Sequence, residues 1–188
     1  KETGEAGGGM TYNLGAHVID QAVQLFGMPQ AIFADIATLR DNGVVDDYFI
    51  IHLLKPSKAP DVRITLKASY LMCEREPRFI LHGTEGSFVK YGLDRQEEDL
   101  TNGLMPDSPH WGEEDSSIWG LLHTEKNTIN VRERYPSLPG NYGAFYENIY
   151  QHIRNGIILE SDAREVVDVI RLIEAAWESS RTKSVQNL

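Results

Sequence analysis

The spacing of hydrophobic and polar residues changes along the chain and predicts the order helix, strands, helices. Helical spacing follows the glycine run at 7–9 and stops at Gly27 and Pro29, in the order expected for a helix end. Four polar residues fall within roughly a 60° arc of this helix, at spacings of four, three and four. This polar stripe consists of Asn13, His17, Asp20 and Gln24. The other side carries Leu14, Val18, Ile19, Ala22, Leu25 and Phe26, so the helix is predicted to have a core face.

Seven short segments with twofold alternation or continuous apolar character predict strands. They are residues 31–38, 47–54, 62–70, 78–82, 87–90, 121–124 and 128–132. The alternation is clearest in 62–70, where Ile64, Leu66 and Ala68 share one face. Such alternation favours an antiparallel sheet with one face on the core and the other on water or a partner subunit.

The remainder of the chain is predicted to contain one long loop and two helices. The acidic stretch 94–117 is interpreted as a loop, whose length is typical of a lid, a partner contact or a mobile segment. Helical spacing returns at 142–155 and again from 163 to about 181. Ser161 or Asp162 is the expected N-terminal cap of the last helix.

Composition excludes several classes of protein. The 188 residues are 41% hydrophobic and 24% charged, which fits one soluble globular domain or a large part of a bigger enzyme. A net charge of −10 without a Lys/Arg cluster argues against nucleic-acid and anionic membrane partners. No apolar run approaches the roughly 18 residues of a membrane span. The single Cys73 excludes an internal disulfide, so we expect a reducing, cytoplasmic location.

The polar stripe is the main candidate for chemistry. A histidine exchanges protons near neutral pH, Asp20 can orient the ring of His17 from one turn away, and Asn13 can hold a hydroxyl group. These three side chains suit a site that binds a polyol and removes a proton from it. A solvated helix face with a local His–Asp contact has the same spacing, so the spacing alone leaves both interpretations open.

Other catalytic motifs are absent from the sequence. The glycine run matches neither G-x-G-x-x-G nor G-x-x-x-x-G-K-[ST], and there is no G-x-S-x-G. Cys73 lacks an activating neighbour, which argues against nucleophilic hydrolysis. The histidines are dispersed, and His110 near Glu113 and Glu114 is interpreted as solvated, so no metal is expected.

Four ordered segments resemble a known family. They are GGGMTYNLGAHVIDQAVQLFG, LHGTEGSFVKYGLDRQE, PGNYGAFYENIYQHIRNG and REVVDVIRLIEAAWESSR. In this order they resemble the C-terminal domain of the glucose-fructose oxidoreductase, inositol dehydrogenase and rhizopine catabolism (Gfo/Idh/MocA) family. The resemblance runs from Gly7 to about Arg181.

The resemblance implies an α+β fold and a nicotinamide cofactor. The expected fold is a large, open, mostly antiparallel sheet with helices packed on one face, like the C-terminal domain of dihydrodipicolinate reductase. The other sheet face would form a homo-oligomer. In the family an N-terminal Rossmann domain binds NAD or NADP. The chain has no dinucleotide fingerprint and no initiator Met, so residues 1–188 are expected to be one substrate-binding and oligomerisation domain without its cofactor domain.

The resemblance also implies roles for single residues. The family has D-x-x-x-H on this helix, and its histidine exchanges a proton with the substrate hydroxyl. His17 matches that histidine, whereas Asn13 stands where the family has an acid. Asp20 matches a further substrate-binding position, and Tyr142 is a candidate for the pocket wall. An amide keeps the hydrogen-bonding shape but cannot place a negative charge beside an imidazolium.

Two hypotheses follow from the sequence. In the first, the parent protein is an NAD(P)-dependent oxidoreductase acting on a sugar, polyol or related hydroxy compound, and this chain alone is inactive. In the second, Asn13 marks a non-catalytic ligand-binding or oligomerisation module.

Overall fold

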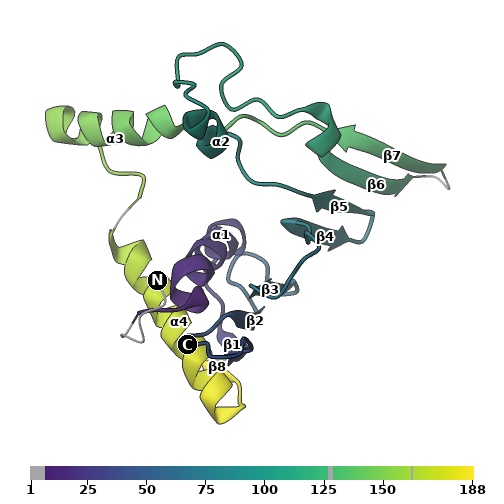
Figure 1. Cartoon of the computed structure of the whole chain (residues 1–188), viewed down its shortest axis with the longest axis vertical. Coiled ribbons are helices and arrows are strands. Elements are labelled where there is room, and N and C mark those ends of the chain that lie inside the picture. Colours follow the sequence, from purple (N-terminus) through teal and green to yellow (C-terminus); the bar gives the residue numbers. More distant parts are fainter. Residues whose placement is uncertain (1–6, 127–128, 162) are drawn as a thin grey trace. The chain divides into compact units, whose positions relative to one another are not determined.

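The computed structural model describes residues 7–126, 129–161 and 163–188, which form two compact units (Figure 1). The first unit comprises the described residues up to Cys73 and those from Ser161 onward. Its elements are the π-helical turn η1 (Thr11–Gly15), α1 (Ala16–Phe26), β1 (Ala31–Ala37), β2 (Tyr48–Leu54), β3 (Arg63–Ser69), α4 (Ala163–Thr182) and β8 (Gln186–Asn187). The second unit is Glu74–Glu160. It contains β4 (Phe79–Gly83), β5 (Gly86–Lys90), α2 (Gln96–Thr101), the 3₁₀ turn η2 (Ser116–Ile118), β6 (Gly120–Lys126), β7 (Ile129–Tyr135) and α3 (Tyr142–Asn155).

The predicted α+β class with antiparallel strands is confirmed. In the described part of the chain the strands form two four-stranded sheets, with the orders β3-β2-β1-β8 and β4-β5-β6-β7. All seven predicted strand segments contain a strand, and the three predicted helices are present. Thr128, at the start of the predicted strand 128–132, and the predicted cap Asp162 lie outside the described residues.

The core of the first unit follows directly from strand register. Three cross-strand rows bring apolar side chains to one face of β1, β2 and β3. The rows are Ile32–Leu53–Ile64, Ala34–Ile51–Leu66 and Ile36–Phe49–Ala68. Helix α1 contributes Ile19 to the same cluster, and helix α4 contributes Leu172 and Ile173. Both helices therefore cover one face of this sheet, as the alternation in 62–70 predicts.

Two serines of α4 complete the hydrogen bonding of β1. Strand β8 pairs only with the first two residues of β1, which leaves the later N–H groups on that side without a strand partner. The Ser179 hydroxyl accepts the N–H of Ala34 at 2.9 Å, and the Ser180 hydroxyl accepts that of Ile36 at 2.9 Å. The helix thus satisfies the uncovered edge of the strand, where unpaired backbone groups would otherwise be buried.

The loop between β1 and β2 is held by a buried carboxylate. The side chain of Asp47 is fully buried and accepts the N–H groups of Leu39 and Arg40 at 2.7 and 3.0 Å. The Arg40 guanidinium adds a contact from Nε at 2.8 Å. Burial alone would raise the pKa of Asp47, but the hydrogen bonds from Leu39 and Arg40 outweigh it, so the pKa lies below its ordinary value of 3.8.

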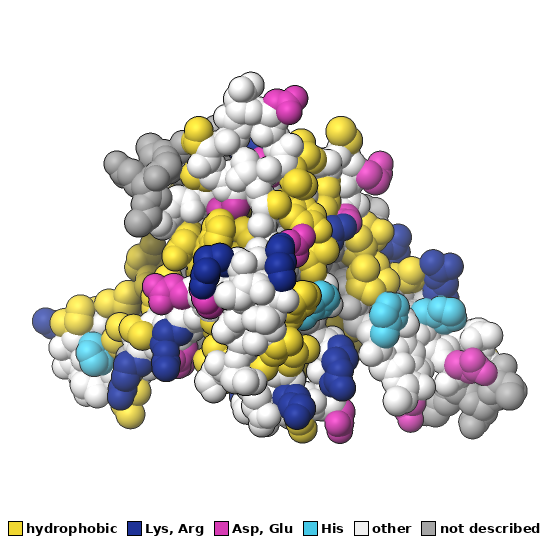
Figure 2. Space-filling view, turned by 90° about the horizontal axis from the view of Figure 1, so that it is seen from below, with side chains coloured by type: hydrophobic (Ala, Val, Ile, Leu, Met, Phe, Trp, Pro, Cys, Tyr) yellow, Lys and Arg dark blue, Asp and Glu magenta, His cyan; other side chains and the backbone are white. Residues whose placement is uncertain are grey.

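The sheet of the second unit exposes much of its apolar surface. Its four strands pair in antiparallel order, and β7 is exposed along its whole length. The exposed large side chains of these strands include Ile80, Leu81, Ile129, Val131 and Tyr135. Figure 2 shows hydrophobic side chains reaching the surface of the protein among charged ones. Exposed apolar surface of this kind is typical of a contact surface.

The serine contacts predict a measurable contribution to stability. Ser180→Ala leaves the N–H of Ile36 buried without a partner, so we expect the free energy of unfolding to fall by about 1–3 kcal/mol. Glu174→Ala, an exposed change on the same helix, is expected to alter it by less than about 0.5 kcal/mol. Urea unfolding of both variants measures the difference, and equal effects would contradict this role of the hydroxyl.

Asp47 predicts a pH-dependent loss of stability. Because its folded pKa is lowered, its contribution is complete above the ordinary pKa of 3.8 and disappears as the pH falls through the folded pKa. Asp47→Asn should therefore lower the free energy of unfolding by about 1–3 kcal/mol at neutral pH, with a difference that shrinks at pH values below 3.8. Asp61→Asn, an exposed change, is the control. A difference that is constant with pH would contradict the role of the Asp47 charge.

Candidate functional site

The polar stripe occupies the outer side of the helix formed by η1 and α1. Asn13 and His17 are exposed and Asp20 is half-buried, whereas Ile19 and Ala22 on the opposite side are buried in the core. The amphipathic helix is therefore confirmed. Leu25 was assigned to the core face and is an exception, since it is 57% exposed. It lies in the last turn, where other residues of the helix make the core contacts.

The three predicted site residues of the stripe are available for a ligand. Within the described chain, no side-chain hydrogen bond engages Asn13, His17 or Asp20, so the local His–Asp contact is not formed. The structure brings these residues together on one helix face. Among the described residues these side chains have no hydrogen bond to break before they accept, donate or transfer protons.

The glycine run gives the backbone the conformation that it needs just before this helix. Gly7 and Gly9 have φ values of 83° and 95°, in the region that favours glycine. A Cβ atom on Gly9 would also overlap Oδ1 of Asp46. The glycines therefore serve positive φ and close backbone approach.

Asp46 of the β1–β2 loop binds the first turn of the helix. Its backbone oxygen accepts the N–H of Met10 at 3.0 Å. Its Oδ2 accepts both the N–H and the hydroxyl of Thr11, each at 2.6 Å. The aspartate is only 3% exposed, and a carboxylate at this end of a helix is favoured by the helix dipole.

This helix terminus does not fit the pyrophosphate of a dinucleotide. A phosphate at a helix N-terminus is bound by free N–H groups. Here the N–H groups of Met10 and Thr11 already contact Asp46, whose negative charge would repel a phosphate. The glycine run is therefore not a nucleotide-binding loop.

Tyr142 lies in the second unit, at the first turn of α3. Its N–H donates to Oε1 of the buried Gln96 at 2.8 Å, and Asn141 caps the helix by accepting the N–H of Ala144. Desolvation raises the pKa of the Tyr142 phenol, and the nearby charges of Glu97 and Asp94 raise it further. The phenol therefore stays protonated to a higher pH than an ordinary tyrosine. Its membership of one pocket with His17 stays a prediction.

The acidic stretch has more structure than the sequence indicates. Its interpretation as a loop throughout was wrong for residues 96–101, which form α2. The fully buried Gln96 connects this helix to Trp111, whose Nε1 donates to Oε1 of Gln96 at 3.0 Å. Buried Lys90 donates to Oε1 of Glu114 at 2.9 Å, as a partly desolvated ion pair. Polar contacts rather than an apolar stripe hold this segment, so hydrophobic periodicity does not reveal it.

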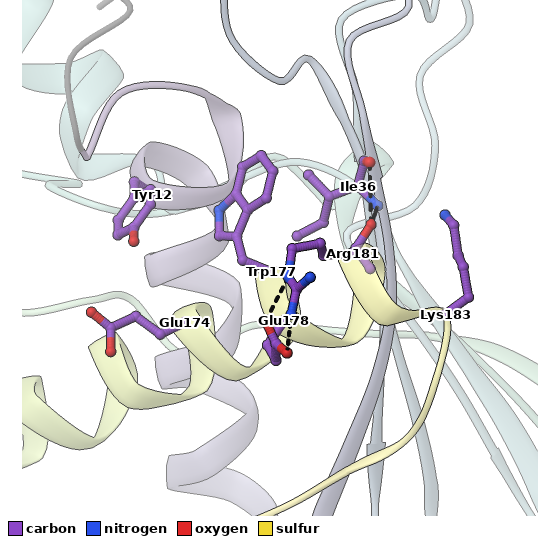
Figure 3. A pocket seen from close by; sticks show the side chains of 8 residues that line it. Tyr12, Ile36, Glu174, Trp177, Glu178, Arg181 and Lys183 are labelled. Carbon is purple, nitrogen blue, oxygen red and sulfur yellow. Dashed lines mark hydrogen bonds and ion pairs between the residues drawn. The ribbon is translucent and has the colours of Figure 1, made fainter.

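An open hollow of about 520 Å³ lies beside the first turn of the helix, within the first unit (Figure 3). It is lined by Tyr12, Ile36, Glu174, Trp177, Glu178, Ser180, Arg181 and Lys183. Figure 3 shows the ion pair between Glu178 and Arg181, which is 2.6 Å long. The lining does not include Asn13, His17 or Asp20. The hollow and the polar stripe therefore lie on different sides of the helix formed by η1 and α1.

Metal-binding clusters and membrane-spanning helices are both absent from the described residues. No group of three or more His, Cys, Asp or Glu side chains in this part of the chain is arranged to hold a metal ion. His110 contacts Glu113 at 2.8 Å on the exposed surface. No helix in the described ranges combines the length and apolar character needed to cross a bilayer.

Comparison with known proteins shows the family. The profile of the oxidoreductase family, C-terminal alpha/beta domain (Gfo/Idh/MocA), matches residues 1–188. The chain therefore belongs to the Gfo/Idh/MocA oxidoreductases, as the resemblance of its motifs predicts.

Individual relatives agree with this assignment. The chain is 38% identical to the scyllo-inositol 2-dehydrogenase (NADP(+)) IolW of Bacillus subtilis, over 93% of this chain and 48% of that protein. It is 35% identical to the uncharacterized oxidoreductase YdgJ of Escherichia coli, over 98% and 51%. A crystal structure of a proposed oxidoreductase from Bacteroides fragilis has a TM-score of 0.90 at 58% identity, and covers 100% of this chain and 55% of that one. The chain spans about half the length of the curated relatives it matches.

The geometry at Gly9 predicts a stability effect. Gly9→Ala should lower the free energy of unfolding by about 1–3 kcal/mol, because alanine is strained at this φ and its Cβ would overlap Asp46. Gly15→Ala is the matched control, since its Cβ would meet only ordinary contacts, the nearest at 3.5 Å from Thr11. That control is expected to be neutral or stabilising by up to about 1 kcal/mol. Chemical unfolding compares the two, and an equal effect would contradict the proposed constraint.

Proposed function

We propose that this chain is the substrate-binding part of an NAD(P)-dependent oxidoreductase that acts on a sugar, polyol or related hydroxy compound. The observation that carries the proposal is the polar stripe, whose side chains are free on a helix fixed to the core by its other face. Family membership supports oxidoreductase chemistry. The substrate class is supported by the relative IolW, whose name gives scyllo-inositol and NADP(+).

His17 is the proposed catalytic residue. When a substrate alcohol is oxidised, its hydroxyl proton would pass to the imidazole of His17. A nicotinamide cofactor bound by the parent protein would supply the hydride acceptor. Asp20 lies one turn further along the helix and would accept hydrogen bonds from neighbouring substrate hydroxyls. Such an array suits a ligand with several adjacent hydroxyl groups, because each one donates and accepts.

Asn13 gives this site a neutral group where the family motif has an acid. Its amide can both donate to and accept from a substrate hydroxyl. It cannot stabilise an imidazolium by charge, so proton transfer to His17 receives less electrostatic help than a carboxylate would supply. The residue is therefore assigned to the catalytic site mainly for holding the reacting hydroxyl in place.

The cofactor is proposed to bind mainly outside these residues. The helix terminus at Met10 and Thr11 does not fit a pyrophosphate, since Asp46 occupies it. We accordingly expect the isolated chain to be inactive and assign NAD or NADP to an N-terminal domain of the parent protein. No metal is assigned to the reaction.

The proposal includes a homo-oligomeric assembly and a cytoplasmic location. We propose residues 1–188 as one substrate-binding and oligomerisation domain, with a homo-oligomer formed through a sheet face. The exposed apolar side chains of β4 and β7 support such a contact. A cytoplasmic location is proposed because the only cysteine is Cys73.

A second candidate function is favoured by Asn13 alone. Without the acid of the family motif, the site could hold a polyol without oxidising it, as a ligand-binding or oligomerisation module. This candidate predicts ligand binding with no reduction of NAD or NADP. Turnover distinguishes it from the first proposal.

The catalytic assignment predicts a specific loss of turnover. His17→Ala in the intact protein should lower kcat by about 10²-fold or more, because it removes the group that accepts the proton. The assay follows the reduction of NAD and NADP with scyllo-inositol, other inositols and simple sugars.

Gln24→Ala is the control for this experiment, since Gln24 is an exposed member of the same stripe without an assigned role. It should leave kcat unchanged. Unchanged turnover in His17→Ala would contradict the catalytic assignment. Binding without turnover in the wild-type protein would favour the module instead.

A further inference from the structure

The polar stripe is not carried by a uniform α-helix. Asn13 lies in the π-helical turn η1, whereas His17 and Asp20 lie in the α-helical part that follows. A π turn closes its hydrogen bonds over five residues instead of four, so it changes the angle between residues before and after it. The position of Asn13 relative to His17 therefore depends on the π turn being formed. Single π turns of this kind occur frequently at functional sites.

The later part of this helix is fixed by ordinary packing. Ile19 and Ala22 are buried in the core, and the helix ends at Gly27, whose N–H donates to the oxygen of Val23 at 2.7 Å. These contacts set the orientation of His17. The π turn packs on the same core, since Leu14 contacts the buried cluster and Thr11 and Gly15 are buried, but the hydrogen-bonding groups of its first residue need partners of their own.

Asp46 supplies these hydrogen-bond partners. Its Oδ2 holds both the N–H and the hydroxyl of Thr11, the first residue of the turn, at 2.6 Å. Its Oδ1 lies so close to Gly9 that no larger residue fits there. The hydrogen bonds that the structure shows for the buried Asp46 carboxylate all come from Thr11.

The β1–β2 loop is held by a different carboxylate, that of Asp47. This neighbouring carboxylate is equally buried, but it contacts Leu39 and Arg40 of the same loop and nothing on the helix. Adjacent aspartates thus hold two different segments. The loop would be held in place by Asp47 without the contact from Asp46 to the helix.

We propose that Asp46 is a positioning residue for catalysis, which acts through Thr11 to hold the π turn and thereby sets Asn13 against His17. This inference rests on the proposed function of the stripe. Asp46 itself touches no substrate. Because a catalytic group must be placed accurately relative to the reacting hydroxyl, a small rotation of Asn13 would slow proton transfer more than it would weaken binding.

The experiment compares isosteric variants of the intact protein that contains this chain. Thr11→Val removes only the hydroxyl that binds Asp46, and Asp46→Asn removes the charge and one acceptor. We expect each to lower kcat by about 10-fold to 10²-fold with KM changed less than threefold. Thr11→Ser keeps the hydroxyl and should restore kcat.

Asp47→Asn is the matched control, since it removes an equally buried carboxylate from the adjacent position. It should lower thermal stability as much as Asp46→Asn while leaving kcat within twofold of the wild type. Equal losses of kcat in the two aspartate variants would overturn the inference, because they would show a general effect of stability. Should Asp46→Asn fail to fold, the Thr11 pair decides the question.

A structural measurement separates this inference from the proposed function. Crystal structures of the Thr11→Val and Asp47→Asn variants show whether the Asn13 side chain moves relative to the His17 ring. Movement in Thr11→Val alone shows that Asp46 positions Asn13 through Thr11, and an active His17→Ala would then contradict the proposed function and not this contact. No movement and no loss of kcat in Thr11→Val, together with an inactive His17→Ala, would overturn the inference and leave the proposed function standing.

Discussion

The contact between the Asp46 carboxylate and Thr11 is the interaction on which the candidate site depends. It joins the start of the helix to the β1–β2 loop at two distances of 2.6 Å, in a place from which water is excluded. Gly9 is the residue that makes so close an approach possible. Burial of a carboxylate is costly unless hydrogen bonds compensate for it, and here the donors are the Thr11 hydroxyl and a backbone N–H that the helix terminus leaves unpaired. One arrangement therefore satisfies both the carboxylate and the helix.

The regular part of this fold could be predicted from sequence because it depends on repeating patterns. The twofold alternation of Ile64, Leu66 and Ala68 places the core face of the first sheet correctly. Gly27 ends helix α1 with a positive φ of 82°, as its position before Pro29 indicates. In these cases each local preference agrees with the tertiary packing, so sequence and structure lead to the same element.

The remainder was not predictable because it depends on contacts between distant residues. Helix α2 contains the single large apolar residue Leu100, and it is held instead by the buried amide of Gln96, which contacts Trp111. Strand β8 is only two residues long and exists through its pairing with β1. No pattern of hydrophobic and polar residues marks the π turn. Asp46, which contacts it, is 35 residues away from Thr11 in the chain. The stripe itself was visible, whereas the residue that holds its first turn was not.

The serine hydroxyls of α4 limit how copies of this protein can associate through the edge of β1. A β-sheet usually grows by adding a strand from another molecule to a free edge. On β1 that route is blocked beyond Ile32, because Ser179 and Ser180 already occupy the N–H groups that an incoming strand would need. In the first unit, the edge strands of the sheet are β3 and the two-residue β8, so β3 offers the longer edge for strand addition.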